Sequence, residues 1–321
     1  MGLKCSTHER GAHERRAQVR PITVVGSYNA SETIRVSRLP RPGETIMGTG
    51  YSKGPGGKGS NQAVAARRLD GEVRFIGCVG RDGNGDEAAL LWESEKVASE
   101  GVRQVSRHTG TALIVVSEGT GANIITIAPG ANLDLSPAHI LESRAAITGC
   151  GVVLTQLEIP VKTAMAAARV GREEGALVIL NPAPAVSASE LDLSQVDVIT
   201  PNEQEFGLLS GSDSLEAGTV AILKKGPRTV IVTLGEGGAY VATEKRSYRV
   251  PAPRVKSVDE TGAGDAFNGA LAVALSKGEE MEEAIRFANA AGALTVTKEE
   301  VIPALPRKAE VEALRRSAIL S

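Results

Sequence analysis

The chain of 321 residues contains few aromatic side chains, and its charges nearly balance. Aromatic residues make up 3% of the sequence, which leaves little material for a surface that stacks nucleic-acid bases. The formal net charge is −2, so no basic field attracts nucleic acid or an anionic membrane. We therefore expect neither a nucleic acid nor a membrane as a partner.

Cysteine and histidine are also scarce. The three cysteines are Cys5, Cys78 and Cys150, an odd number without the CxxC spacing of zinc or redox sites. This usage favours a reducing compartment, and we expect a cytoplasmic protein. Two of the four histidines, His8 and His13, fall near the N-terminus, so a histidine-based triad or metal site is not expected.

Long apolar runs are absent as well. No run approaches the roughly 18 residues that a membrane-spanning helix needs. Residues 1–20 are polar, carry charges of both signs and lack the apolar centre of a secretory signal. Arginines in this stretch would suit a transit peptide, but Glu9, Glu14 and the shortage of serine argue against one. We predict a disordered N-terminal extension over residues 1–20 and one folded domain over residues 21–321.

The rest of the chain alternates short β-branched apolar runs with alanine-rich segments of helical length. Residues 196–200 are too apolar for burial on one face only, which favours a sheet covered on both sides. The strand–helix–strand rhythm then predicts an α/β fold: a doubly wound, mostly parallel sheet with helices on both faces. The expected strands are 22–28, 73–79, 112–117, 123–127, 152–157, 176–180, 196–200, 229–234 and 239–242. The expected helices are 60–69, 85–100, 161–174, 214–225, 265–276, 281–297 and 307–318.

Residues 31–52 follow a different pattern. Residues 33–36 alternate apolar and polar, residues 39–43 form a proline–glycine turn, and residues 44–51 extend again. With residues 109–127, this hairpin is expected to form a small antiparallel lid. We expect the lid to cover the carboxyl ends of the parallel strands, where open α/β sheets bind ligands.

The most informative motif is DETGAGDAFNG at residues 259–269. Gly262 and Gly264 let successive N–H groups point to one spot at the start of an apolar helix, which suits an anion. Asp265 beside that spot can accept a proton from an attacking hydroxyl. An anion cradle with a base is what phosphoryl transfer to an alcohol requires. Alone, the motif is equally well explained by a glycine turn followed by a helix-capping aspartate.

A second glycine cluster, GPGGKGSN at residues 54–61, precedes a helix. It formally matches GxGxxG, but no apolar strand precedes it and Pro55 lies inside it, so the dinucleotide-binding interpretation fails. It does not have the spacing of a phosphate-binding P-loop either. What remains is a backbone that a ligand can approach closely, with Lys58 and Asn61 as hydrogen-bond donors, or a solvated glycine turn.

Two further segments follow strands. In TPNEQE at residues 200–205, Asn202 and Glu205 lie one turn apart and suit hydrated Mg²⁺ with its phosphates, although both are common at helix starts. In TLGEGG at residues 233–238, glycines after a strand can admit a nucleotide or form a simple hairpin turn.

These motifs, in this order, resemble the ribokinase, or PfkB, family of carbohydrate kinases. The resemblance runs from about residue 22 to residue 306 and includes both signature regions, GGKGSNQAVAA at residues 56–66 and DETGAGDAFNGAL at residues 259–271. QLE at 156–158, NPAP at 181–184 and ITPNEQE at 199–205 resemble the ribokinase branch in particular.

The resemblance implies roles for individual residues. Asp265 would be the base, and the N–H groups of Gly262, Ala263 and Gly264 would hold the transferring phosphoryl. The implied sugar-binding residues are Asn29, Ser31, Gly57, Lys58, Asn61, Glu158 and Asp265. The implied ATP-binding residues are Asn202, Thr233, Gly235, Gly238, Gly264 and Asn289, with Glu205 holding Mg²⁺ through water. The family also implies a lid that closes over the sugar and a homodimer formed through the lid.

Three positions depart from the family pattern. Ser31 stands where ribokinases carry an aspartate that grips vicinal sugar hydroxyls. Asp259 and Thr261 of a potassium site remain, but Glu300 and Ala304 replace a small turn residue and a hydroxyl, so K⁺ activation is expected to be weak or lost. Asn289 stands where many ribokinases have a histidine near adenine.

The sequence therefore predicts an ATP- and Mg²⁺-dependent kinase that phosphorylates a primary sugar hydroxyl, with D-ribose the expected substrate. One alternative is another substrate of the family, such as a nucleoside, fructose or a keto-deoxy sugar acid. A second alternative is a non-catalytic sugar- or nucleotide-binding protein on the same fold.

Overall fold

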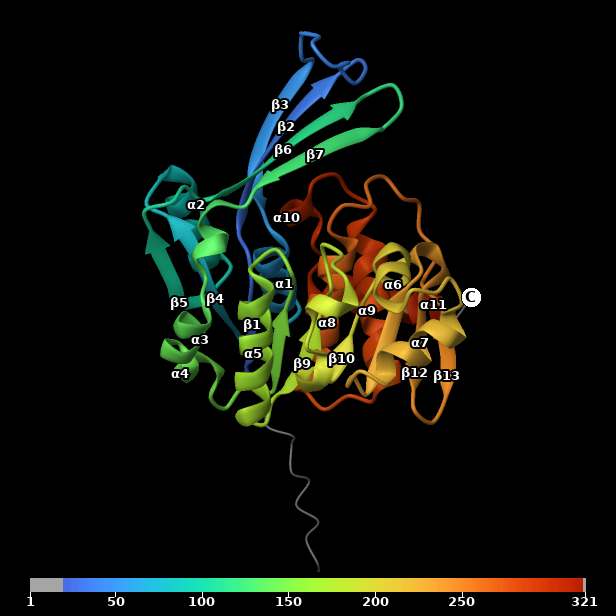
Figure 1. Cartoon of the computed structure of the whole chain (residues 1–321). Helices are drawn as coiled ribbons and strands as arrows, with labels where there is room; N and C mark the ends of the chain where they lie inside the picture. The colour runs from blue at the N-terminus through green and yellow to red at the C-terminus, as the bar shows by residue number, and fades with distance from the viewer. Residues whose placement is uncertain (1–19, 320–321) are drawn as a thin grey trace, which may run out of the picture.

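The computed structural model describes residues 20–319, and the side chains of residues 20–317. Its centre is a nine-stranded sheet in the order β13-β12-β11-β10-β9-β8-β1-β4-β5 (Figure 1). All neighbouring strands are parallel except the β11–β12 and β12–β13 pairs, which are antiparallel. The predicted doubly wound, mostly parallel α/β fold is confirmed. The predicted extension over residues 1–20 lies, except for residue 20, outside the described residues.

The elements of the central sheet alternate with helices along the chain. Its strands are β1 Ile22–Val25, β4 Val73–Gly80, β5 Ala98–Val105, β8 Val152–Thr155, β9 Leu177–Leu180, β10 Val198–Ile199, β11 Thr229–Thr233, β12 Ala239–Thr243 and β13 Ser247–Val250. The α-helices are α1 Lys58–Arg68, α2 Gly83–Ser94, α3 Pro137–Glu142, α4 Arg144–Ile147, α5 Val161–Glu173, α6 Glu203–Ser210, α7 Leu215–Leu223, α8 Ala263–Ser276, α9 Met281–Thr295, α10 Val301–Ala304 and α11 Lys308–Ile319.

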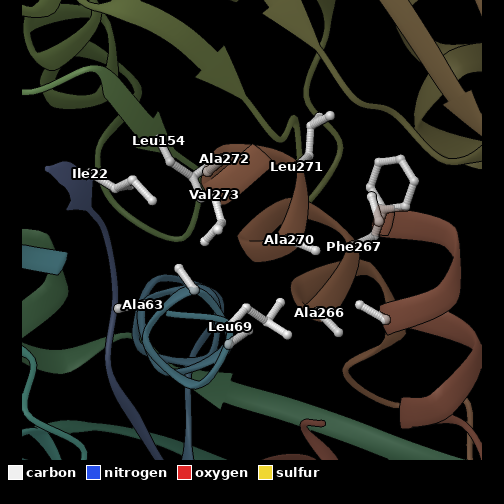
Figure 2. Packing of buried hydrophobic residues seen from close by; sticks show 14 of the residues in the cluster. Ile22, Ala63, Leu69, Leu154, Ala266, Phe267, Ala270, Leu271, Ala272 and Val273 are labelled. Atoms are coloured by element: carbon white, nitrogen blue, oxygen red, sulfur yellow. The ribbon is translucent and has the colours of Figure 1, made fainter. Parts of the chain in front are cut away.

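Side chains that alternate along the strands feed two separate cores. Val24 and Leu154 belong to the core shared with α1, α8 and α9, whereas Val25 and Val153 belong to the core shared with α3, α5 and α6. Helices therefore cover both faces of the sheet, because every second residue of a buried parallel strand needs an apolar partner on each side. Figure 2 shows the first core, with short side chains of α8 packed between Ala63 and Leu69 of α1 and the sheet.

Close packing of α1 on α8 depends on small residues. A Cβ added at Gly269 of α8 would lie 2.8 Å from the Cβ of Ala65 on α1. Real Cβ atoms do not approach this closely, so the two helices meet backbone to backbone at this point. The contact brings the beginnings of α1 and α8, which contain the two signature motifs, to the same edge of the sheet.

A second sheet, the lid sheet, projects from the main body (Figure 1). It consists of β2 Asn29–Val36, β3 Gly50–Gly56, β6 Gly110–Ser117 and β7 Asn123–Ala128, in the order β3-β2-β6-β7. The sequence predicts a wholly antiparallel lid, and this detail is wrong: β2 and β6 pair in parallel. The two lid hairpins come from segments separated by α1, β4, α2 and β5, and their first strands, β2 and β6, leave the body side by side and in the same direction.

The predicted helix over residues 85–100 is also wrong at its C-terminal end. The helix α2 ends at Ser94, and Lys96 adopts a left-handed conformation with φ 57°. The chain then reverses into β5, which pairs with β4 and forms the edge of the central sheet. Alanine and glutamate at residues 98–100 favour a helix by intrinsic propensity, but strand pairing with β4 decides the structure here.

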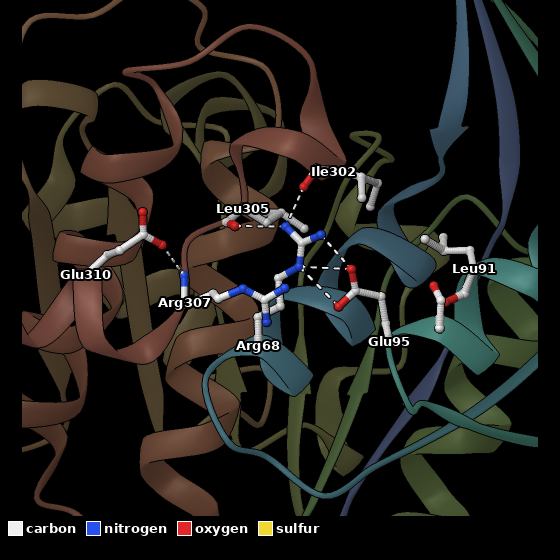
Figure 3. Close-up of polar contacts among 8 residues, drawn as sticks. Arg68, Leu91, Glu95, Ile302, Leu305, Arg307 and Glu310 are labelled. Carbon is white, nitrogen blue, oxygen red and sulfur yellow. Dashed lines mark hydrogen bonds and ion pairs between the residues drawn. The ribbon is translucent and has the colours of Figure 1, made fainter.

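The C-terminal segment is fastened to the body by Arg68 at the end of α1 (Figure 3). One guanidinium nitrogen of Arg68, Nη1, donates to the carbonyls of Ile302 at 2.6 Å and Leu305 at 2.9 Å. The other two nitrogens, Nε and Nη2, donate to the carboxylate of Glu95, with a shortest distance of 2.5 Å. The arginine therefore holds α10, and with it Val301, against the start of α8.

Among the described residues, no helix has both the length and the apolar character that crossing a membrane requires.

Candidate active site

The carboxylate of Asp265 lies in the first turn of α8, at the carboxyl-terminal edge of the central sheet. It is buried, with 6% of the residue exposed. Asn61 Nδ2 donates to its Oδ2 at 2.8 Å, and Gln62 Nε2 donates to its Oδ1 at 3.0 Å. Burial raises the pKa of Asp265, and the charge of Glu158 adds to this; the positive charge of Lys58 and the two amide hydrogen bonds act in the opposite direction. Asp265 is therefore a buried carboxylate that two amides stabilise in the ionised form.

The turn before Asp265 provides backbone donors. Gly262 is the N-cap of α8 and has a positive φ of 85°, a conformation that favours glycine. The N–H of Ala263 donates to the Glu260 carbonyl at 3.3 Å. Within the described part of the chain, the N–H groups of Gly262 and Gly264 make no hydrogen bond to the protein. A Cβ added at Gly264 would meet no atom within 4 Å, so the space beside this turn is open.

Glu158 forms the opposite wall. One of its oxygens, Oε2, accepts hydrogen bonds from Ser27 Oγ at 2.6 Å, Asn29 Nδ2 at 3.2 Å and the Lys58 N–H at 2.9 Å. Three donors on one oxygen fix the carboxylate. Glu158 follows β8, Ser27 follows β1, Asn29 begins β2 and Lys58 begins α1, so the carboxylate joins these segments at the edge of the sheet.

Glycines allow these segments to approach each other. Gly57 has φ 87°, and a Cβ added there would lie 2.6 Å from the Asn29 backbone nitrogen. A Cβ at Gly59 would lie 2.5 Å from the Ser27 nitrogen. The glycine cluster at residues 54–61 therefore serves close contact with the end of β1, and α1 begins directly at Lys58.

Lys58 supplies positive charge to the site. Burial alone would lower the pKa of Lys58, but the negative charges of Asp265, Glu158 and Glu205 outweigh burial, and the pKa is raised. Lys58 is therefore a cation at neutral pH. Its positive charge partly balances the carboxylates of Asp265 on α8, Glu158 after β8 and Glu205 on α6.

Ser31 lies in β2, where the lid sheet leaves the body. It pairs with Gly54 on β3 and with Ala112 on β6. A Cβ added at Gly56 would lie 2.6 Å from Ser31 Oγ, so the absence of a side chain at Gly56 makes room for the hydroxyl. At this position the lid therefore carries a small neutral hydroxyl group.

Asn202 and Glu205 form a capping box at the start of α6. The Glu205 N–H donates to Asn202 Oδ1 at 2.8 Å, and Asn202 N–H and Nδ2 donate to the Glu205 carboxylate at 2.9 and 3.1 Å. Burial raises the pKa of Glu205; the Asn202 N–H and Lys58 lower it, and Asp265 raises it. The contacts of Asn202 and Glu205 are therefore those of a helix cap. Both oxygens of the Glu205 carboxylate, which lies near Asp265, already accept hydrogen bonds from Asn202.

The remaining candidates for nucleotide binding lie near β11, β12 and β13 of the central sheet. Thr233 ends β11 and bridges to Asn202. Gly235 has φ 53° and open space beside its Cα, whereas a Cβ at Gly238 would collide with the Val250 carbonyl at 2.1 Å. Asn289 is buried in α9, and its Nδ2 donates to the carbonyls of Val250 at 2.9 Å and Pro251 at 3.3 Å. Asn289 therefore holds the end of β13.

Asp259 and Thr261 lie just before the α8 turn. Asp259 Oδ1 accepts from the Thr261 N–H at 2.9 Å and from Thr261 Oγ1 at 2.7 Å. Glu300 adopts a positive φ of 63°, and its neighbour Glu299 forms an exposed ion pair with Arg35 of the lid at 2.9 Å. Across residues 20–317, no three histidine, cysteine or acidic side chains are grouped so that they could hold a metal ion.

Sequence reasoning missed several polar residues of this site. Gln62 contacts Asp265 directly, and Gln156 and Asn181 contact Gln62. Asn132 donates to Asn29 Oδ1 at 2.9 Å and holds the Tyr28 backbone at 2.9 and 3.1 Å. A signal was present for Gln62, which lies beside Asn61 in the GGKGSNQAVAA region, whereas Asn132 lies in a segment without any recognisable pattern.

Comparisons with known proteins identify the family of this chain. Residues 20–308 match the family described as pfkB family carbohydrate kinase. A ribokinase of Haemophilus influenzae is 39% identical over 295 residues, which cover 90% of this chain and 96% of that protein.

Solved structures agree in fold over almost the whole chain. A ribokinase from Thermotoga maritima gives a TM-score of 0.85 at 36% identity, covering 92% of this chain and 99% of that one. Arabidopsis thaliana ribokinase, solved with ribose and ATP, gives a TM-score of 0.85 at 32% identity, covering 93% and 99%. The chain belongs to the pfkB family of carbohydrate kinases and is an ATP-dependent sugar kinase.

Proposed function

We propose that the protein transfers the γ-phosphoryl group of ATP to O5 of D-ribose, giving D-ribose 5-phosphate and ADP. Asp265 accepts the proton of the primary hydroxyl, the O5–phosphorus bond forms, and the bond from phosphorus to the β–γ bridging oxygen breaks. The observation that carries this proposal is the hydrogen bond of 2.8 Å from Asn61 to Asp265, since it joins the proposed base to a residue proposed to bind the sugar. Ribose is proposed because relatives across almost the full chain are ribokinases, one of them solved with ribose and ATP.

The sugar is held between α1 and the Glu158 wall in this proposal. Gly57 lets the start of α1 lie against the Asn29 backbone, and Lys58, Asn29 and Glu158 offer donors and acceptors to the hydroxyls of the sugar. Within the described chain, Asn61 Oδ1 is buried without a hydrogen-bond partner. A buried acceptor of this kind costs about 1–3 kcal/mol if it stays unpaired, so a sugar hydroxyl is a suitable partner. Ser31 completes the site from the lid.

The phosphates lie at the start of α8. The free N–H groups of Gly262 and Gly264, with that of Ala263 in the same turn, stabilise the charge that develops on the transferred phosphoryl group. Thr233, Gly235 and Gly238 line the nucleotide, with Asn202 beside them and Asn289 beneath the end of β13. The open space at Gly235 and Gly264 fits a ligand that approaches the backbone.

Mg²⁺ is the expected metal, and it would neutralise phosphate charge and orient the γ-phosphoryl group. Glu205 fits a role through bound water, because its oxygens already accept hydrogen bonds from Asn202. Asp259 and Thr261 fit a K⁺ site poorly, since Asp259 Oδ1 already accepts two hydrogen bonds from Thr261.

We also propose a homodimer formed through the lid sheet. Ile34, Tyr51, Leu113 and Ile124 lie on one face of this sheet by register, and each is 44% to 64% exposed. An apolar face of four neighbouring strands is typical of a protein interface. Leu113→Arg is expected to give a monomer by light scattering, whereas Leu208→Arg on α6, equally exposed but away from the lid, keeps the dimer.

The decisive experiment measures ADP release over a panel of sugars, including D-ribose, 2-deoxyribose, fructose, nucleosides and keto-deoxy sugar acids. The proposal predicts the highest kcat/KM with D-ribose. A higher kcat/KM with another sugar would make that sugar the substrate instead of D-ribose. The presence of Ser31, where ribokinases carry an aspartate, favours this alternative. Binding of ribose or ATP without turnover of any sugar would favour a non-catalytic protein.

A further inference from the structure

Gln62 is the buried side chain that links the Asp265 carboxylate to the ends of the parallel strands. It is fully buried in α1, and its Nε2 donates to Asp265 Oδ1 and to Asn181 Oδ1, both at 3.0 Å. Its Oε1 accepts from Gln156 Nε2 at 2.6 Å. Every hydrogen-bonding atom of this amide is therefore in use.

The neighbours of Gln62 fix which way its amide points. Asn181 Nδ2 donates to the Thr200 carbonyl at 3.3 Å, which leaves Asn181 Oδ1 as the acceptor that faces Gln62. Gln156 donates through its Nε2 to Gln62 Oε1, while its own buried Oε1 has no hydrogen-bond partner among the described residues. With an acceptor on one side and a donor on the other, only one orientation of Gln62 satisfies all partners, and it aims an N–H at Asp265.

This arrangement matters because Asp265 lies in a crowded electrostatic environment. The charged groups that face it are the Lys58 ammonium from α1, the Glu158 carboxylate after β8 and the Glu205 carboxylate on α6, and α8 adds the positive end of its dipole. Burial and the two carboxylates favour a protonated, inactive aspartic acid. An amide cannot lose or gain a proton near neutral pH, so its N–H stabilises the ionised aspartate without taking part in proton transfer.

We propose that Gln62, held by Gln156 and Asn181, is a positioning residue that keeps Asp265 ionised and aims its second oxygen at the sugar hydroxyl. The inference rests on the proposed role of Asp265 as the base. It assigns a function to three amides that are not among the residues proposed to bind the sugar or the nucleotide. Asn61 holds Oδ2 from the sugar side, whereas Gln62 holds Oδ1 from the protein side.

The test compares the pH dependence of kcat/KM in wild type, Gln62→Met and Gln62→Glu. Methionine keeps the volume and removes the N–H, so the acidic limb should move up by about one pH unit, and kcat should recover at higher pH. Glutamate adds a carboxylate that shares a proton with Asp265, so the limb should move further. KM for ATP should stay unchanged in both variants. A uniform loss of kcat at every pH, with the limb in place, would overturn the inference.

Two additions keep the test decisive. If Gln62→Met folds poorly, Gln156→Met, which removes the donor that orients Gln62, should move the limb in the same direction by a smaller amount. Gln104→Met on the exposed face of β5 is the matched control and should leave the profile unchanged.

The carboxyl ¹³C resonance of Asp265, assigned with Asp265→Asn, gives its pKa without turnover. A wild type that turns over no sugar would overturn the proposed function. An equal ¹³C pKa in wild type and Gln62→Met would overturn this inference alone.

Discussion

Asn61 and Asp265 are 204 residues apart in the sequence, and yet Nδ2 of Asn61 lies 2.8 Å from Oδ2 of Asp265. The contact forms because α1 and α8 pack closely through small residues, Ala65 and Gly269, further along the two helices. Each helix begins at a glycine with positive φ, Gly57 and Gly262, so both signature motifs place a glycine turn and a polar side chain at the same edge of the sheet. A base and a sugar-binding amide thus meet where neither motif alone would provide a site.

Replacing Asp265 by asparagine should abolish most turnover. The amide keeps the shape but cannot accept the hydroxyl proton, so we expect kcat to fall by about 10² to 10⁴-fold. ATP binding, measured by calorimetry, should stay close to wild type because the N–H groups of Gly262 and Gly264 remain. A kcat within a factor of about three of wild type would exclude Asp265 as the base.

The wild-type pH profile should carry the signature of a raised carboxyl pKa. Burial and Glu158 raise the pKa of Asp265 overall. The base works only when ionised, so kcat/KM should fall as the pH drops through this raised pKa, at a higher pH than for an ordinary aspartate. Activity should be lost while the fold, followed by circular dichroism, is still intact. An acidic limb at the pKa of an exposed aspartate would contradict this expectation.

Ser31→Asp tests which hydroxyls the lid recognises. A hydrogen bond to an ionised acceptor contributes about 1.5–3 kcal/mol, against about 0.5–1.5 kcal/mol for a neutral one. Because an aspartate can accept from both vicinal hydroxyls, the variant should bind D-ribose about ten- to a hundredfold more tightly. The gain should be smaller for 2-deoxyribose, which lacks one of the two vicinal hydroxyls. Thr33→Asp, two residues along the same strand and on the same face, is the control and should leave ribose binding unchanged. An unchanged KM for ribose in Ser31→Asp would count against a ribose site of the usual form.

The sequence predicts the fold well wherever a segment is long and its period clear. The parallel strands and the helices α5, α8 and α9 are of this kind, since burial on both faces leaves continuous apolar runs. The strands β5 and β13 were missed, because residues 98–105 and 247–250 are largely polar edge strands that only a neighbour stabilises. The parallel β2–β6 pair depends on contacts 81 residues apart, which no local pattern encodes.

The part of the site that lies beside glycine-containing motifs could be predicted from the sequence. Gly57 and Gly262 mark turns with positive φ, and Asp265 and Glu158 follow from the motifs around them. The second layer was not predictable in the same way: Gln62 looks like one polar residue in a helix, and its role depends on Asn181, which comes from another strand end. Asn289 shows the reverse case, since its Nδ2 supports the backbone of β13.

Monovalent cations should have little effect on turnover. Asp259 Oδ1 is committed to Thr261, and Glu300 turns with φ 63° into α10, a conformation that is costly for a glutamate. We expect equal kcat in K⁺ and in tetramethylammonium at matched ionic strength. Glu300→Gly should relieve the backbone strain, raise the thermal midpoint and show whether this turn limits cation binding. Strong stimulation of the wild type by K⁺ would show that the altered loop still forms a site.

The two glycines of the α8 turn should respond differently to alanine, although both lie beside the proposed phosphate position. At Gly262 an added Cβ would lie 2.7 Å from Val301 Cγ1, and φ is 85°. We therefore expect Gly262→Ala to cost about 1–2 kcal/mol of stability from the backbone alone. Adding Val301→Ala should recover only the steric part of the loss. At Gly264 an added Cβ meets no protein atom within 4 Å.

Gly264→Ala should therefore leave the free energy of unfolding in urea unchanged, while it weakens ATP binding and lowers kcat, because the new methyl group projects into the space assigned to the phosphates. The matched pair separates folding from function at two positions of one turn. Equal stability losses in the two variants would show that the turn is packed on both sides. Full activity in Gly264→Ala would place the transferring phosphoryl group away from the start of α8.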